Sequence, residues 1–390
     1  MSIKEAYELA LKREPMIRAQ LQIQSSNSRY DAIKGAALPQ INLKADYSRL
    51  DDTRVTSSTF SKDPHNVSLE LTQSLFRGGR EYAELRKGKT QIDSSEWESQ
   101  KTQFDLLNEL VKSFVEVQYY EEELKLRTEI QKLSQDRVNF LKERVRIGRS
   151  RKSELVSAEA QLASAESDLD EAKTLLLTSR EQLCFLTGKE VGTKITPIPY
   201  QIKLKNIDHY LSKISSSPNL QFEKLKVELI KEDLNIAKSG HWPSLDLKGN
   251  YYLHRNGSNS QSDWAVTLSL TLPLFESGKT SSNIDQAAFT LSSAESSFRY
   301  INQQLERDVR TLYDSLFLSE NQVQSFSKSV ELNRQNYQIQ LREYGLGLVN
   351  NLEVLQTLGQ YNQSRSRLNA ERIKNYYRLL SLLGDSTEIN

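Results

Sequence analysis

Residues 264–272 read Trp-Ala-Val-Thr-Leu-Ser-Leu-Thr-Leu, and they decide the fold because a large apolar side chain stands at every second position. Trp264, Val266, Leu268, Leu270 and Leu272 point one way, and the smaller Ala265, Thr267, Ser269 and Thr271 point the other. A period of two residues predicts a β-strand with one apolar and one polar face. Where that apolar face is sheltered from water decides what the protein does.

Three other stretches alternate in the same way, and the four form two predicted strand pairs: 41–50 with 66–75, and 245–254 with 263–272. Each pair is joined by a loop of turn-forming and polar residues. Nearly all of the remaining sequence is typical of long helices. An isolated hairpin is marginally stable in water, so two hairpins in a helical chain cannot bury their apolar faces on themselves.

The chain contains an internal repeat of about 200 residues, which is much longer than a solenoid repeat and indicates a gene duplication. Each half has a helix, a strand opened by a proline (Pro39 and Pro243), a second strand and then long helices. The sequence therefore divides into a first repeat at 1–188, a linker at 189–217 and a second repeat at 218–390.

The predicted helices are unusually long. No proline interrupts the stretch between Gly79 and Gly148, and about 68 residues in one helix would span roughly 100 Å. Beyond Gly148, leucines recur every seven residues from Leu155 to Leu183, with small residues three positions further on. Such heptads predict coiled-coil packing, and the small residues allow helices to approach closely.

Composition excludes several classes of function. Lys and Arg (52) nearly balance Asp and Glu (51), so no basic field indicates nucleic-acid binding, and no apolar run is long enough for a transmembrane helix. The single cysteine rules out an intrachain disulfide, and the four histidines lack metal-ligand spacing. With no phosphate-binding loop or nucleophile motif either, we expect no enzyme, no cofactor and no metal site. The first residues lack the apolar region of a signal peptide, so we expect an exported form to have lost its signal.

The order of several landmarks resembles the TolC-like outer-membrane factor family (outer membrane efflux protein). They are Leu38-Pro39-Gln40, the stretches 69–76 and 270–278, Arg146-Ile147-Gly148 and Tyr344-Gly345-Leu346-Gly347. The resemblance implies a mainly α protein with a β-barrel part, in which four antiparallel strands per protomer join a trimeric twelve-stranded barrel in the Gram-negative outer membrane. It also implies that long helical hairpins form a periplasmic tunnel, which meets an inner-membrane transporter through a periplasmic adaptor (a membrane fusion protein).

Physical reasoning from the strands agrees with the resemblance. In lipid only a closed barrel satisfies every strand backbone, and about eight strands are the minimum, so four strands require an oligomer. The apolar faces are then expected to meet outer-membrane lipid, with the charged side chains toward a water-filled lumen. These side chains are Lys44, Asp46, Glu70, Asp246 and Lys248.

The helix turns at 148 and 345–349 are expected at the end remote from the barrel. By resemblance, the docking surface for the adaptor comprises Gly148, Arg149, Gly345, Leu346, Gly347 and Leu348. The residues expected at the tunnel constriction and gate, also by resemblance, are Ser153, Glu154, Tyr344, Glu353 and Gln356. Two positions depart from the family pattern: Gln356 stands where a second acid is common, and Val349 where some members carry a gating arginine. The first turn is basic and the second apolar, which predicts that the second is the main docking surface.

Two alternatives remain open from sequence alone. A soluble, elongated coiled-coil scaffold would explain the heptads but not the duplicated strands. A soluble sandwich would bury the apolar strand residues, and no exposed apolar band would then exist. Within the channel interpretation, drug or metal efflux and type I protein secretion use the same kind of exit duct, and no residue pattern selects the cargo.

Overall fold

The computed structural model describes residues 1–49, 65–190, 192, 194–196, 204–256 and 262–385. They form two compact units, and both units draw on both sequence repeats. The sheet unit comprises residues 18–100 and 218–301, and the hairpin unit comprises residues 1–17, 101–217 and 302–390.

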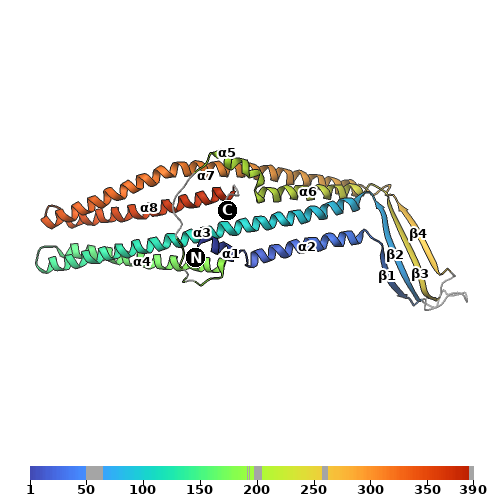
Figure 1. Cartoon of the computed structure of the whole chain (residues 1–390), viewed down its shortest axis with the longest axis horizontal. Helices are drawn as coiled ribbons and strands as arrows, with labels where there is room; N and C mark the ends of the chain where they lie inside the picture. The colour runs from blue at the N-terminus through green and yellow to red at the C-terminus, as the bar shows by residue number, and fades with distance from the viewer. Residues whose placement is uncertain (50–64, 191, 193, 197–203, 257–261, 386–390) are drawn as a thin grey trace. The chain divides into compact units, whose positions relative to one another are not determined.

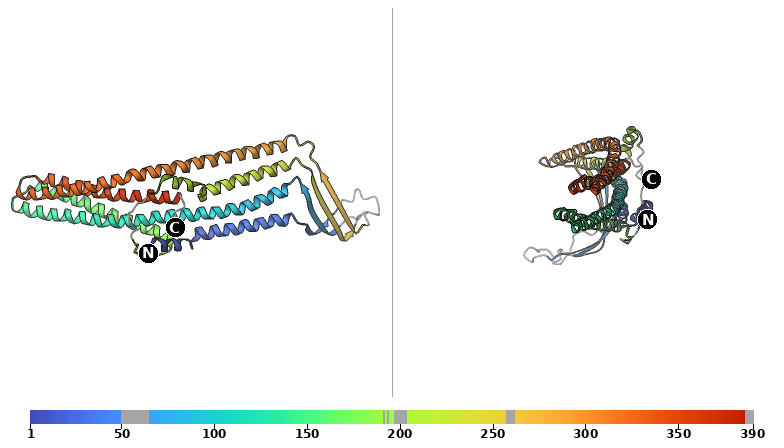
Figure 2. Two further views of the ribbon diagram at one scale, coloured as in Figure 1. Left: turned by 45° about the horizontal axis from the view of Figure 1, so that its top comes forward. Right: turned by 90° about the vertical axis from the view of Figure 1, so that its left-hand side faces the viewer.

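The described residues of the sheet unit form one four-stranded antiparallel sheet in the order β1-β2-β3-β4 (Figures 1 and 2). The strands are β1 (Gln40–Tyr47), β2 (His65–Arg77), β3 (Ser244–Asn256) and β4 (Trp264–Thr271). The two predicted hairpins are thus joined by pairing between β2 and β3. The central strands are longer than predicted because each has a neighbour on both sides, so their end residues also find partners.

The register places the apolar residues of all four strands on one face. Leu43 lies opposite Leu69, Leu69 opposite Tyr251, and Tyr251 opposite Trp264. The register shifts twice between β2 and β3, next to Val67 and next to Phe76. Bulges of this kind increase the local twist of a sheet, which suits curvature.

Helices continue from the sheet on glycine-bearing turns. The sheet unit holds most of α2 (Glu14–Ala36), all of α6 (Pro218–Ser239), and the first parts of α3 (Arg80–Arg146) and α7 (Lys279–Leu346). Between β2 and α3, Gly78 and Gly79 have φ of +65° and +82°. A Cβ on Gly78 would lie 2.6 Å from the Ser239 carbonyl oxygen, so only glycine fits this junction.

The hairpin unit is built from two helical hairpins. The rest of α3 pairs with α4 (Lys152–Thr187), and the rest of α7 turns into α8 (Asn351–Asp385) (Figure 1). Its described residues also form three short helices: α1 (Ile3–Ala10), α5 (Ile207–Lys213) and the 3₁₀ helix η2 (Ile214–Ser216). The last two lie inside the segment predicted to be a linker, whose Pro197 and Pro199 lie outside the described residues.

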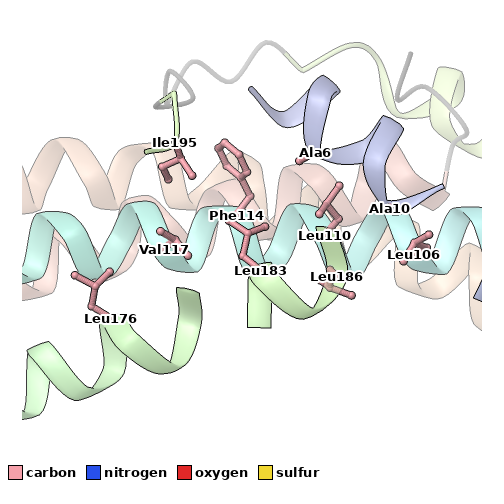
Figure 3. Packing of buried hydrophobic residues seen from close by; sticks show 10 residues of the cluster. All are labelled: Ala6, Ala10, Leu106, Leu110, Phe114, Val117, Leu176, Leu183, Leu186 and Ile195. Carbon is pink, nitrogen blue, oxygen red and sulfur yellow. The ribbon is translucent and has the colours of Figure 1, made fainter. Parts of the chain in front are cut away.

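The heptad pattern corresponds to the packed side of α4, where Leu155, Leu162 and Leu169 are half-buried. Ala158, Ala165, Ala172 and Ser179 are all buried, and so are Leu176 and Leu183. Figure 3 shows the largest core cluster, in which α1 contributes Ala6 and Ala10, and Phe114 of α3 lies near Leu183 of α4. None of the described helices is long and apolar enough to cross a membrane.

Candidate functional site

The apolar face of the sheet is exposed. Six of its side chains are between 61% and 70% exposed: Ile41, Leu43, Trp264, Val266, Leu268 and Leu270. Their positions on neighbouring strands make the face continuous. A soluble sandwich that buries these residues is therefore wrong. An apolar surface of this extent, unrelieved by charge, is typical of contact with lipid or with another protein.

The opposite face of the sheet carries hydrogen-bonded polar groups. Asp246 accepts a hydrogen bond from the Ser74 hydroxyl at 2.6 Å and pairs with Arg77 at 3.5 Å. Lys44 and Asp46 form an ion pair at 3.5 Å on β1. Glu70 and Lys248 lie on the same face by strand alternation. The five charged residues predicted to face water therefore share one side.

Two edges of this sheet have no neighbour within the described residues. β1 pairs only with β2, and β4 pairs only with β3. Unpaired strand edges present rows of backbone N–H and C=O groups that favour pairing with another chain. The sheet thus has both an apolar face and two pairing edges available for assembly.

In the hairpin unit, both helix turns use the same backbone motif. Gly148 (φ +72°) donates its N–H to the Val145 carbonyl, and the next N–H, of Arg149, reaches the Arg144 carbonyl at 2.8 Å. Gly347 (φ +79°) and Leu348 repeat these bonds toward Tyr344 and Glu343, at 3.1 and 3.0 Å. This pair of bonds around a left-handed glycine is the Schellman motif, which ends a helix. We name residues 147–151 the first tip and 347–350 the second tip.

The two tips differ in how the following helix begins. The second tip ends with Asn350, whose side-chain oxygen accepts the Glu353 N–H at 3.1 Å while its amide donates to the Glu353 carboxylate at 2.7 Å. The first tip ends with Arg151, which makes no side-chain cap. Its Glu154 instead accepts hydrogen bonds from Ser150 and from the Tyr344 hydroxyl, the latter at 3.3 Å.

The predicted gate residues are only partly brought together. Tyr344 is buried and touches Glu154, as the resemblance implies, and it also lies 3.1 Å from the Ser150 hydroxyl. Ser153 and Gln356 are exposed and make no contact with this group that the structure records. Ser150, which the sequence analysis did not select, contacts both Glu154 and Tyr344. A serine four residues before a glutamate at a helix start was the available signal.

Tyr344 packs in a cluster that joins the two hairpins. Val138 and Leu141 of α3 contribute to it, as do Ala158 of α4 and Val354 of α8. The guanidinium carbons of Arg137 and Arg144 lie 4.3 and 4.8 Å from the centre of the Tyr344 ring. Neither arginine was singled out from the sequence.

The surfaces of the two tips have different chemistry. On the second tip and the flanking end of α7, Leu346 and Leu348 are 77% and 71% exposed, and Gly345 is exposed beside them. Around the first tip the cations Arg149, Arg151 and Lys152 are exposed, and Arg146 pairs with Glu143. One turn is therefore apolar and the other basic.

Two histidines of neighbouring strands stack on each other. The structure brings His65 and His254 together, with their Nε2 atoms 3.0 Å apart across β2 and β3, which the sequence did not indicate. Among the residues that the structure describes, no group of three His, Cys, Asp or Glu side chains is arranged to hold a metal ion.

Comparison with known proteins identifies the family. A model described as outer membrane efflux protein matches residues 6–189 and 212–384. The chain belongs to the outer membrane efflux protein family. It is 20% identical over 344 residues to outer membrane protein TolC of Vibrio cholerae, covering 84% of this chain and 77% of that protein.

Solved structures of outer-membrane channels have the same fold. The CmeC outer membrane channel of Campylobacter jejuni superposes with a TM-score of 0.86 at 17% identity, covering 99% of this chain and 85% of that one. The outer membrane protein VceC of Vibrio cholerae gives a TM-score of 0.86 at 15% identity, covering 98% and 96%. The predicted architecture, long helices with four antiparallel strands, is thereby confirmed.

Membership of the outer membrane efflux protein family confirms three predictions: the family, the outer-membrane efflux channel, and the Gram-negative outer membrane with helices in the periplasm. The soluble coiled-coil scaffold is accordingly set aside. The family is one of channels rather than known enzymes, and it implies trimeric assembly and association with pump components.

Proposed function

We propose that three copies of this chain close one twelve-stranded barrel, through which substrates leave the cell. The observation that carries the proposal is the continuous exposed apolar face of a sheet with two open edges. Pairing β1 of one copy with β4 of the next satisfies both edges, and threefold repetition closes the ring. The apolar face then meets lipid, and the face with Asp246 and Lys44 lines water.

Two neighbouring substitutions on β4 test which face meets lipid. Leu268→Arg puts a charge on the apolar face, which costs about 2–4 kcal/mol near the bilayer centre. Ser269→Arg puts the same charge on the polar face, opposite Asp246 in the register. We expect the first variant to lose heat-stable trimers and liposome conductance, and the second to keep both. Equal behaviour of the two variants, or a detergent-free monomer of the unmodified chain, would contradict the barrel.

The two tips are proposed to dock a periplasmic adaptor, which connects the channel to an inner-membrane transporter. Leu346 and Leu348 support this role because both are large, apolar and exposed on a rigid turn. Gly347 allows the second tip to turn because its φ is positive. Gly148 and Arg149 form the corresponding part of the first tip. The adaptor and transporter decide whether the cargo is a drug, a metal ion or a secreted protein, because the energy source resides with them.

Glu353 is proposed to form the constriction. Threefold symmetry would bring three copies of its carboxylate together, and a ring of like charges attracts cations. Asn350 fixes this carboxylate through its amide, while Gln356 one turn later adds no charge. Glu154 and Ser153, with Tyr344, would border the same opening. We expect Glu353→Gln to reduce cation preference in single-channel recordings, and Gln356→Ala to leave it unchanged. Unchanged selectivity in Glu353→Gln would remove Glu353 as the filter.

A further inference from the structure

Arg137 of α3 makes a buried connection to the second hairpin. Arg137 is only 5% exposed. Its Nε donates a hydrogen bond to the Asn351 side-chain oxygen at 2.9 Å, and its Nη2 donates a second one to the same oxygen. Asn351, 2% exposed, is the first residue of α8 and directly follows the second tip. One side chain therefore ties the first hairpin to the start of α8.

The surroundings of Arg137 supply no counter-charge by direct contact. No ion pair to it is found among the described residues, and its Nη1 is buried without a hydrogen-bond partner there. Its guanidinium instead lies over two rings, 4.3 Å from Tyr344 and 5.3 Å from Phe140. Burial lowers the pKa of Arg137, with Tyr344 and Glu154 acting in the opposite direction and Arg144 in the same one.

Burying a guanidinium of this kind costs free energy, because the charge loses its hydration. Apolar residues of similar volume are often equally or more stabilising than a buried charge, so stability alone does not explain this arginine. Buried charges that do not serve stability are expected where function requires a specific geometry. The cation–π contact with Tyr344 and the hydrogen bonds to the Asn351 oxygen hold this geometry, and both are lost when the hairpins separate, whereas the contact with Phe140 stays within α3.

We propose that Arg137 is a gate-positioning residue that holds the second hairpin, through Asn351 and the Tyr344 ring, against the first. This inference rests on the channel function proposed above. Val349, two residues before Asn351, is half-buried against the same cluster and brings no charge. The cation that joins the hairpins is supplied from α3 instead, and its acceptor stands two residues after Val349.

The structure offers a matched control for a test. Arg365 of α8 also joins α3 to α8, through an ion pair with Glu129 at 2.6 Å. Replacing either arginine with methionine removes one charged link between the same two helices while preserving volume. The readout is single-channel conductance of the full chain in planar bilayers, after trimers have been verified by gel mobility.

Arg137→Met is expected to raise the fraction of time spent in the open state by about tenfold or more, because losing even one of its two charge-assisted hydrogen bonds has that effect. Arg365→Met is expected to match the unmodified channel. Asn351→Asp, which turns the link into a buried ion pair, is expected to lower the open fraction. Arg137→Lys, which keeps the charge but loses the planar fork, is expected to lie between the unmodified channel and Arg137→Met.

Trimeric Arg137→Met and Asn351→Asp channels that conduct like the unmodified one would overturn the inference. An equal rise of the open fraction in Arg365→Met would also overturn it, because losing any link between α3 and α8 would then open the channel. If Arg137→Met does not assemble, Asn351→Asp and Arg137→Lys decide the question. An unmodified chain that forms no pore would instead overturn the proposed channel function itself.

Discussion

The first and second tips share a backbone but not a surface. Each has a left-handed glycine and two matching backbone hydrogen bonds, and each is followed by a helix with glutamate as its third residue. Yet the first tip and the start of α4 present arginines and a lysine, whereas the second tip and the end of α7 present leucines. The comparison shows that one turn geometry can present two surfaces of different chemistry. Two equivalent hairpin ends can therefore contribute unequal parts of one docking surface.

The largest effect is expected from breaking the second turn. Gly347→Val places a β-branched residue at φ +79°, a conformation that costs an L-residue about 1–2 kcal/mol or more. The turn must shift, moving Leu346 and Leu348, so we expect transport to be abolished with trimers still in the membrane. Gly148→Val should cost as much locally but reduce transport less, since charges tolerate displacement better than close apolar packing.

A neighbouring glycine provides the control. Gly345 lies in helix α7 without a positive φ, and a Cβ there would meet no atom within 4 Å. Gly345→Ala should therefore leave transport intact. Normal transport in Gly347→Val would show that the second turn does not act in docking.

An intermediate effect is expected from exchanging the tip side chains. Leu346→Ser with Leu348→Ser removes apolar area worth about 1.5–3 kcal/mol for each leucine when fully buried. Co-purification with a tagged adaptor should then be lost at any salt concentration. Arg149→Gln should weaken binding by about fivefold or less, and only at low ionic strength. If Arg149→Gln weakened adaptor binding more than the two leucine substitutions, the basic first tip would be the main docking surface.

The smallest effect concerns the two helix starts. Asn350→Ala removes a side-chain cap and should cost about 1 kcal/mol, whereas Arg151→Ala removes none and should cost nearly nothing. Arg151→Asn should add a cap to α4. Hydrogen exchange of peptides covering 151–157 and 350–356 measures these changes directly. Equal protection in Asn350→Ala and the unmodified chain would show that the Asn350 cap contributes nothing.

Periodic patterns were sufficient to predict the elements. Alternation over 264–272 marked β4, and the leucine heptads marked the packed side of α4, because both patterns follow directly from the geometry of strand and helix. Pairing between β2 and β3 could not be predicted, since it joins residues far apart in the sequence, such as Leu69 and Tyr251. No local pattern specifies such a register.

The sequence indicated residues near the two turns but only some of their side-chain contacts. Tyr344 and Glu154 meet, which the resemblance implied, and Ser150 contacts Tyr344, which the sequence did not indicate. Arg137 escaped notice because an arginine in a long polar helix is usually a solvated surface residue. Only the structure shows that Asn351 and two aromatic rings surround it.

The closed form of each turn also limits where the molecule bends. At Gly148 and Gly347, two backbone bonds fasten the last helical carbonyls, so bending there would strip several groups of their partners at once. We therefore expect each turn to move as a rigid body when the pore widens. The hinges of that movement then belong to the shafts of α3, α4, α7 and α8, well away from the surfaces that meet a partner.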